Sequence, residues 1–157
     1  MSYEIKEFQG SDLEDAAHLI HNFWGLNVEF EPSIELEENT LEHIKEDLKQ
    51  ALGRDDQMIL LARSNGSPVG IIRVEMKKGR FRGPDRWGNI VEFYVLPRER
   101  RKAVAKNLLD SAIDSLKKKG IKMVTSEFPT QNVPAASFYE RNGFRPFETV
   151  FAKELEE

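Results

Sequence analysis

Residues 95–109 read VLPRERRKAVAKNLL, and this stretch decides the expected fold. An apolar run ends at Leu96, and Pro97 closes it, which is typical of the end of a strand. From Val104 onward the apolar residues recur at helical spacing. Because a second strand-like run follows at 121–128, the helix between the two runs predicts a parallel crossover.

The rest of the chain completes a mixed α/β pattern around this crossover. Hydrophobic periodicity predicts strands at 3–8, 58–63, 69–76, 89–96, 121–128 and 144–153, and helices at 13–24, 41–52, 104–119 and 134–141. A length of 157 residues fits one domain. We therefore expect a single domain over residues 1–157, with a mostly antiparallel sheet, a central parallel pair and helices on both faces.

Local signals predict where some of these elements begin and end. Ser11 and Glu14 form a Ser-x-x-Glu capping box that predicts the start of the first helix, and Gly25 is expected to end it. Asn65-Gly66 lies between two apolar runs, which favours a tight hairpin.

Composition excludes several kinds of chemistry. The chain has no cysteine, so a disulfide, a thiolate metal site and a cysteine nucleophile are all ruled out. His18 and His43 lack partners at metal-ligand spacing, and no metal site is expected. No apolar run approaches the roughly 18 residues that span a bilayer, and the N-terminus lacks a signal-like segment. We therefore expect a cytoplasmic protein that does not enter a membrane.

Charge is unevenly distributed along the chain. Residues 28–57 carry ten acidic side chains against three basic ones, a net charge of −7, whereas residues 73–122 carry fifteen basic against six acidic, a net charge of +9. Solvent-exposed charged faces with no binding role explain these acidic and basic segments as well as ligand binding does. The basic run raises nucleic-acid binding as an alternative. Few aromatic residues beyond Phe81 and Trp87 interleave with those cations, and the acidic pI also argues against it.

The start of the crossover helix is a candidate anion site. The first turn of a helix leaves backbone N–H groups unpaired and carries partial positive charge. Three cations, Arg100, Arg101 and Lys102, stand at this point, and the small residues Ala103 and Ala105 would let a phosphate approach the backbone. A solvated group of cations is the simpler alternative.

A second informative stretch, residues 132–144, reads NVPAASFYERNGF. Asn132 and Tyr139 are seven residues apart and therefore share one helical face. Ala135 and Ala136 between them leave room for a slim polar ligand. In the alternative reading, Asn132 only caps the helix and Tyr139 only buries its ring.

Together the two stretches resemble the GNAT superfamily of N-acetyltransferases, over residues 69–144 by motif and over the earlier part by layout alone. The resemblance implies a GNAT fold in which the central parallel strands splay apart to hold acyl-coenzyme A. It also implies transfer of an acetyl group from acetyl-coenzyme A to a primary amine. Ala103 stands where the family usually has glycine. Because alanine suits a helix better, we expect donor binding to persist.

The resemblance also implies site roles for individual residues. The backbone at a bulge near Phe93 and Val95 would pair with the pantetheine and the thioester carbonyl. Asn132 would contact the pantetheine arm, and Tyr139 would be the acid that protonates the leaving thiolate. The pyrophosphate would bind Arg100, Arg101, Lys102, Ala103, Val104 and Ala105.

A base is needed because only a neutral amine can attack the thioester. The resemblance implies Glu92 as this base, because similar family members carry a glutamate near this position. Asn89 is an alternative position and would not be a base. In the alternative reading, Glu92 is a surface strand residue paired with an arginine.

For the acceptor, the family layout points to a loop at 27–33 and to the strand turn around Trp87, with Glu29, Phe30 and Glu31 as lining residues. His21 and Trp24 either join them or pack in the core. The −7 segment favours a cationic acceptor such as a polyamine, a lysine side chain or a peptide amino terminus.

Two points stay open at this stage. A domain that binds acyl-coenzyme A but is catalytically idle, acting as a sensor or regulator, is the alternative to an enzyme. A homodimer is compatible with the sequence, which does not decide the oligomeric state.

Overall fold

A computed structural model describes residues 3–79, 85–100 and 103–156. Its strands are β1 (Tyr3–Glu7), β2 (Gln57–Ser64), β3 (Ser67–Lys78), β4 (Arg86–Val95) and β5 (Val124–Ser126). Its helices are α1 (Leu13–Phe30), α2 (Thr40–Ala51), α3 (Val104–Lys118) and α4 (Val133–Arg141), with short 3₁₀ turns at Gly10–Asp12 and Pro97–Glu99.

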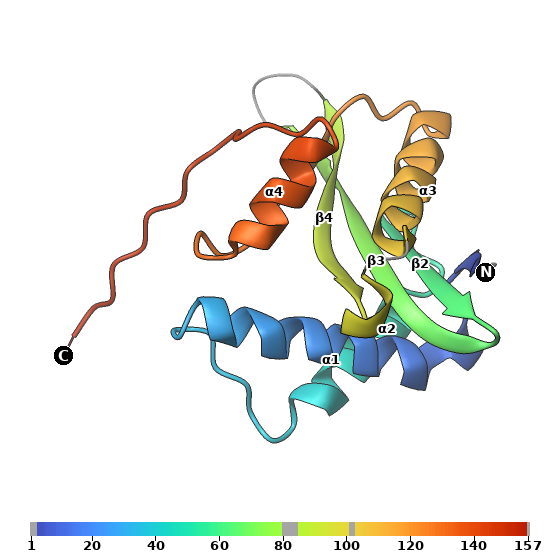
Figure 1. The fold of residues 1–157 in the computed structure, drawn as a ribbon, viewed down its shortest axis with the longest axis horizontal. Coiled ribbons are helices and arrows are strands. Elements are labelled where there is room, and N and C mark those ends of the chain that lie inside the picture. The colour runs from blue at the N-terminus through green and yellow to red at the C-terminus, as the bar shows by residue number, and fades with distance from the viewer. Residues whose placement is uncertain (1–2, 80–84, 101–102, 157) are drawn as a thin grey trace.

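The strands form one sheet in the order β1-β2-β3-β4-β5. The first four strands pair antiparallel, and only β4 and β5 are parallel. Helices α1 and α2 cover one face of the sheet, while α3 and α4 lie on the other (Figure 1). The expected mixed sheet with a parallel pair and helices on both faces is confirmed.

The β2–β3 hairpin is confirmed at its predicted turn. Asn65 and Gly66 have φ angles of +52° and +83°, so both central residues adopt the left-handed conformation that a tight hairpin turn requires. The strands then pair from Ser64 and Ser67 outward, with one irregularity between Ala62 and Arg63.

The first helix differs from its prediction at both ends. Gly25 does not end it, because α1 continues to Phe30 and buries Asn27 on the way. The Ser11 capping box is also wrong: no side chain caps α1. Instead the Asp12 carboxylate accepts the backbone N–H of Gln9 at 2.9 Å within the preceding 3₁₀ turn.

The C-terminal strands are shorter than predicted. Strand β5 covers only three residues of the expected 121–128. The strand expected at 144–153 is absent: residues 144–156 have no regular secondary structure and run away from the body as an extended tail (Figure 1). A strand needs a neighbour to pair with, and periodicity alone cannot supply one.

Helix α3 approaches β3 closely at Gly70. A Cβ atom there would lie 2.8 Å from Leu108 Cδ1 and 3.3 Å from the Tyr94 carbonyl oxygen. By contrast, a Cβ atom on Gly25 in the middle of α1 would meet nothing within 4 Å.

The two glycines therefore predict opposite effects of alanine. Gly25→Ala should stabilise the protein by about 1 kcal/mol, because it removes a poor helix former without a clash. Gly70→Ala should destabilise it by about 1–3 kcal/mol, because α3 must move off the sheet. Thermal unfolding measures both, at roughly 2–4 °C per kcal/mol for a chain of this size. A lower Tm for Gly25→Ala would contradict the continuous α1.

Candidate functional site

Strands β4 and β5 pair over three residues and then part. Their register joins Gly88 to Val124, Asn89 to Thr125 and Ile90 to Ser126, and no further pair follows. From Val91 to Val95, therefore, β4 has no backbone pairing with β5. An exposed edge of this kind offers alternating backbone donors and acceptors to an extended ligand.

A β-bulge lies just where the strands part. On the β3 side, Arg73 pairs with Glu92 and Val74 pairs with Ile90, so Val91 is the extra residue. The bulge expected near 93–95 is thus displaced toward the start of the strand. Phe93 and Val95 lie in regular pairing with β3, on the unpaired part of the β4 edge.

The bulge decides which face Glu92 occupies. Ile90 packs against α3 and α4, and side chains two residues apart in a strand normally share a face. The extra residue shifts the alternation, so Glu92 faces α1 and α2 instead, as Tyr94 does. Phe93 returns to the α3 and α4 side.

Glu92 is a buried carboxylate with two partners. It is 8% exposed, and its Oε2 accepts the indole N–H of Trp24 at 2.8 Å. The Arg73 guanidinium lies 3.3 Å from Oε1. Burial raises the pKa of Glu92 above its ordinary value, while Trp24 and Arg73 act in the opposite direction. Such a group is closer to the working pH of a general base than an exposed glutamate.

Arg73 links this carboxylate to the acidic helix. Its guanidinium also bonds Asp47 of α2 at 2.6 Å and Gln57 of β2 at 3.0 Å. The Arg73 side chain is nearly buried, whereas that of Asp47 is 59% exposed. The sequence reading that Glu92 pairs with an arginine is correct, but the residue is not a surface one. Trp24 and Asp47 were missed as partners because they lie far from Glu92 in the sequence.

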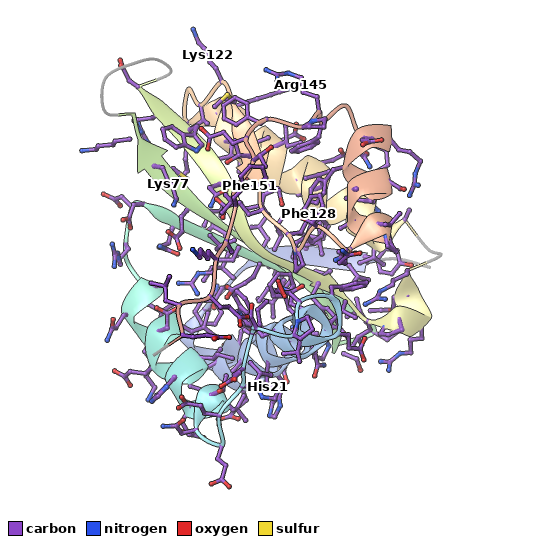
Figure 2. The ribbon with its side chains drawn as sticks, turned by 90° about the vertical axis from the view of Figure 1, so that its left-hand side faces the viewer. His21, Lys77, Lys122, Phe128, Arg145 and Phe151 are labelled. Carbon is purple, nitrogen blue, oxygen red and sulfur yellow. The ribbon has the colours of Figure 1, made fainter. Side chains whose placement is uncertain are left out.

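Tyr139 is buried where the two parallel strands part. Its ring stacks on Phe128 at 5.5 Å and contacts Phe138 and Phe144 (Figure 2 labels Phe128 beside α4). Burial raises the pKa of Tyr139 to about 12, and a hydrogen bond with Ser126, the last residue of β5, partly opposes this. The hydroxyl is therefore fully protonated at neutral pH and can act as a donor.

Asn132 caps α4. Its side-chain Oδ1 accepts the backbone N–H of Ala135 at 3.1 Å. The capping alternative is therefore observed for this side chain, and a contact with pantetheine stays a prediction. Asn132 immediately precedes α4 (Val133–Arg141) and Tyr139 lies within it. A ligand strip along one face between the two residues stays a prediction.

The first turn of α3 forms the candidate anion site. Val104 is buried, Ala105 is half-buried, and the helix begins directly after Ala103. Arg101 and Lys102 lie outside the described residues. The Arg100 side chain reaches back to β4, where Nε donates to the Val95 carbonyl at 2.9 Å and the guanidinium lies over the Tyr94 ring.

The expected acceptor residues end up on a helix. Glu29 and Phe30 form the last turn of α1, and Glu31 follows it, so the loop expected at 27–33 is only partly a loop. Glu29 and Glu31 are exposed and Phe30 is half-buried. On the same helix Trp24 reaches Glu92, whereas His21 lies on the side turned away from the sheet (Figure 2).

Among the described residues, no cluster of His, Asp or Glu is placed to hold a metal ion. Likewise none of the described helices is both long and apolar enough to cross a membrane. A surface cavity of about 260 Å³ lies at Asp47, Arg73 and Glu75, and one of about 550 Å³ lies at Tyr3, Ala103 and Asn107. Neither cavity lies in the opening between β4 and β5.

The family model of GNAT acetyltransferases matches residues 19–144, which is most of the chain. The chain belongs to this family. A spermidine N(1)-acetyltransferase of Thermoplasma acidophilum is 25% identical over 155 residues, covering 95% of this chain and 92% of that protein. An uncharacterized N-acetyltransferase of Methanocaldococcus jannaschii is 28% identical over 102 residues. That match covers 65% of this chain but only 45% of the relative.

Solved GNAT structures show the same fold. The aminoglycoside N-acetyltransferase AAC(6')-Iy in complex with CoA superposes with a TM-score of 0.82 at 18% identity, covering 98% of this chain and 95% of that one. The resemblance to the GNAT superfamily stated from the two motifs is therefore confirmed.

Ala103 departs from the usual GNAT glycine in a way that the sequence did not predict. It does not lie in the helix but immediately before it, with φ +24° and ψ +10°. Left-handed backbone costs a residue with a Cβ atom roughly 1–2 kcal/mol. The expectation that alanine suits a helix better is thus wrong for this position.

Ala103→Gly should raise the free energy of unfolding by up to about 1 kcal/mol, because glycine relieves the strain but has more freedom to lose on folding. Thermal unfolding is the measurement. Ala105→Gly is the matched control and should lower the Tm, because residue 105 lies within α3. A drop in Tm for both variants would contradict the strain at Ala103.

Proposed function

We propose that this chain transfers the acetyl group of acetyl-coenzyme A to a primary amine of a small cationic acceptor, by direct attack in a ternary complex. One observation carries the proposal. A buried carboxylate with a raised pKa and a buried, protonated phenol lie on opposite sides of β4, next to the point where β4 and β5 part.

The described residues fit the donor. The unpaired edge of β4, including Phe93 and Val95, offers hydrogen bonds to the amide-rich pantetheine arm. The first turn of α3, at Val104 and Ala105, offers backbone N–H groups and positive charge to the pyrophosphate. Acetyl-coenzyme A supplies the activated acyl group.

Glu92 is assigned the role of base, directly or through one water molecule. An amine with a pKa near 10.4 is neutral in only about one molecule in a few thousand at pH 7, so removing its proton is a large part of the barrier. Glu92 accepts this ammonium proton. The neutral nitrogen then bonds to the carbonyl carbon, the carbon–sulfur bond breaks with its electron pair going to sulfur, and the second proton lost by the nitrogen ends on the thiolate.

Tyr139 is assigned to the leaving sulfur. A thiol has a pKa of about 8.5, so a phenol with a pKa of about 12 gives up its proton less readily than the thiol does. The hydroxyl therefore stabilises the developing thiolate first of all by donating a hydrogen bond. Complete transfer of the proton from the Tyr139 hydroxyl to the sulfur, the role that the family resemblance implies, is unfavourable in free energy.

The charge on the α1 and α2 side favours a cationic acceptor. Helix α2 carries Glu42, Glu46 and Asp47, and it packs on the face of the sheet where Glu92 lies. The similarity to a spermidine N(1)-acetyltransferase supports a polyamine, and a lysine side chain or a peptide amino terminus fits the same charge.

A panel of amines tests the proposal. Purified protein with acetyl-coenzyme A should release free thiol when a polyamine, an amino sugar or a lysine peptide is added. Calorimetry with acetyl-coenzyme A runs in parallel. Donor binding without thiol release from any amine would support the alternative, a catalytically idle domain that senses acyl-coenzyme A.

Tyr139→Phe should lower kcat by about 10²-fold, because it removes one hydrogen-bond donor to the thiolate while the ring keeps its packing. The calorimetric affinity for acetyl-coenzyme A should stay nearly unchanged. Unchanged turnover in Tyr139→Phe would remove the hydroxyl from the mechanism.

Trp24→Phe should move the acidic limb of the kcat/KM profile to higher pH. Glu92 must be ionised to act as a base, so activity rises as pH passes its pKa. The Trp24 hydrogen bond favours the ionised form, and its loss raises that pKa further.

Glu92→Gln should abolish this limb, and the pH profile of kcat/KM measures both variants. His21→Gln is the control, because His21 also lies on α1 but on the side turned away from the sheet. A limb that disappears in His21→Gln and persists in Glu92→Gln would reject Glu92 as the base.

A further inference from the structure

Arg100 holds a backbone group on the unpaired edge of β4. Its Nε donates to the Val95 carbonyl at 2.9 Å, and its guanidinium carbon lies 5.4 Å from the centre of the Tyr94 ring. These two contacts fix the side chain against the end of the strand. Arg100 belongs to the turn that joins β4 to α3 (Figure 1), and this turn connects the strand edge with the candidate anion site.

The Val95 carbonyl points away from β3. In an antiparallel pair, residues that exchange hydrogen bonds with the neighbouring strand alternate with residues whose backbone groups face outward. The Leu96 backbone N–H donates to the Val69 carbonyl at 2.9 Å, so Leu96 is of the first kind and Val95 of the second. Among the described residues β5 pairs with β4 only as far as Ile90. The outward side at Val95 is therefore the edge that the pantetheine arm is proposed to use.

Arg100 and the donor thus compete for one acceptor. A pantetheine amide that reaches the Val95 carbonyl must displace the guanidinium or share the oxygen with it. Displacement removes one hydrogen bond and the contact with the Tyr94 ring, and both losses weaken binding. A ligand that offers the released guanidinium no new partner has nothing to offset these losses.

A pyrophosphate is such a partner. Arginine binds phosphate through charge-assisted and often bidentate hydrogen bonds, which are roughly twice as strong as bonds between neutral groups. The proposed pyrophosphate site, the first turn of α3 at Val104 and Ala105, belongs to the segment that follows Arg100. A donor that carries a pyrophosphate therefore brings a stronger partner for the guanidinium than the Val95 carbonyl.

We propose that Arg100 makes this chain selective for acyl donors that carry a pyrophosphate, because Arg100 releases the Val95 carbonyl only when the pyrophosphate draws the guanidinium toward α3. The inference rests on the proposed donor site, and it concerns the choice between donors rather than the transfer itself. Thioesters of pantetheine without the nucleotide are disfavoured, although they carry the same reactive group.

Binding of coenzyme A and of pantetheine tests the proposal without any acceptor. Nuclear magnetic resonance titration of the full chain, followed at the amides of Phe93 and Val95, gives a dissociation constant for each probe. Arg100→Met removes the hydrogen-bond donors and keeps an unbranched side chain over the Tyr94 ring. The dissociation constant should rise about tenfold for coenzyme A, which loses a charged partner, and fall at least about threefold for pantetheine, which no longer competes for Val95.

The opposite direction of the two changes is the informative result. Loss of any cation near the pyrophosphate weakens coenzyme A binding, but only release of the Val95 carbonyl strengthens pantetheine binding. Arg98→Met is the matched control, because it removes an equal charge from the same turn and its side chain is 68% exposed. It should leave the pantetheine dissociation constant unchanged. Arg100 is exposed and lies outside both core clusters, and far-ultraviolet circular dichroism reports whether each variant is folded.

A second measurement needs no variant. Adenosine diphosphate supplies the pyrophosphate without the pantetheine arm. Its addition to the unaltered chain should move the carbonyl-carbon resonance of Val95 upfield, because that carbonyl loses its hydrogen bond to Arg100.

Two results would overturn the proposal while leaving the proposed function intact. One is a pantetheine dissociation constant that is unchanged or higher in Arg100→Met, which would mean that Arg100 shares the carbonyl or only braces the turn. The other is a Val95 carbonyl resonance that millimolar adenosine diphosphate leaves in place. Failure of coenzyme A to bind the unaltered chain would instead reject the proposed function together with this inference, so the two failures are distinguishable.

Discussion

The single extra residue in β4 is the constraint on which the rest of the site depends. By placing Val91 outside the ladder, the strand turns Glu92 toward α1 and α2 while Ile90 and Phe93 keep facing α3 and α4. A regular strand would put Glu92 on the same face as Ile90, among the aliphatic side chains of the larger core. There its charge would have neither Trp24 nor Arg73 as a partner, and burial would neutralise it.

The bulge also separates Glu92 from Tyr139, the two groups proposed to act in the reaction. Glu92 belongs to one face of β4 and Tyr139 to the other, so each has its own dielectric surroundings and its own hydrogen-bond partners. Burial pushes both pKa values upward, yet the outcome differs. The phenol becomes a pure donor across the neutral range, while the carboxylate, held by Trp24 and Arg73, stays able to ionise.

Much of the fold could be predicted because its signals are local. The Asn65-Gly66 turn, the crossover between Leu96 and Val104 and the short helix after Asn132 each depend on a few neighbouring residues. The family resemblance implies a bulge in this strand, but its position at Val91 could not be predicted, because an extra residue shows only when two strands are paired. The bond between Trp24 and Glu92 spans 68 positions and has no pattern in the sequence. The end of α1 was misjudged because packing of Trp24 and Leu26 against the core outweighs the poor helix propensity of Gly25.

The chain of contacts from Asp47 through Arg73 to Glu92 also makes the proposed base responsive to dissolved ions. Its inner end is shielded from solvent, but Asp47 is open to water and its attraction for Arg73 weakens as ionic strength increases. The negative charge of Asp47 opposes ionisation of Glu92, so screening that charge makes the carboxylate easier to ionise. Salt thereby acts on the proposed base through one exposed side chain on α2.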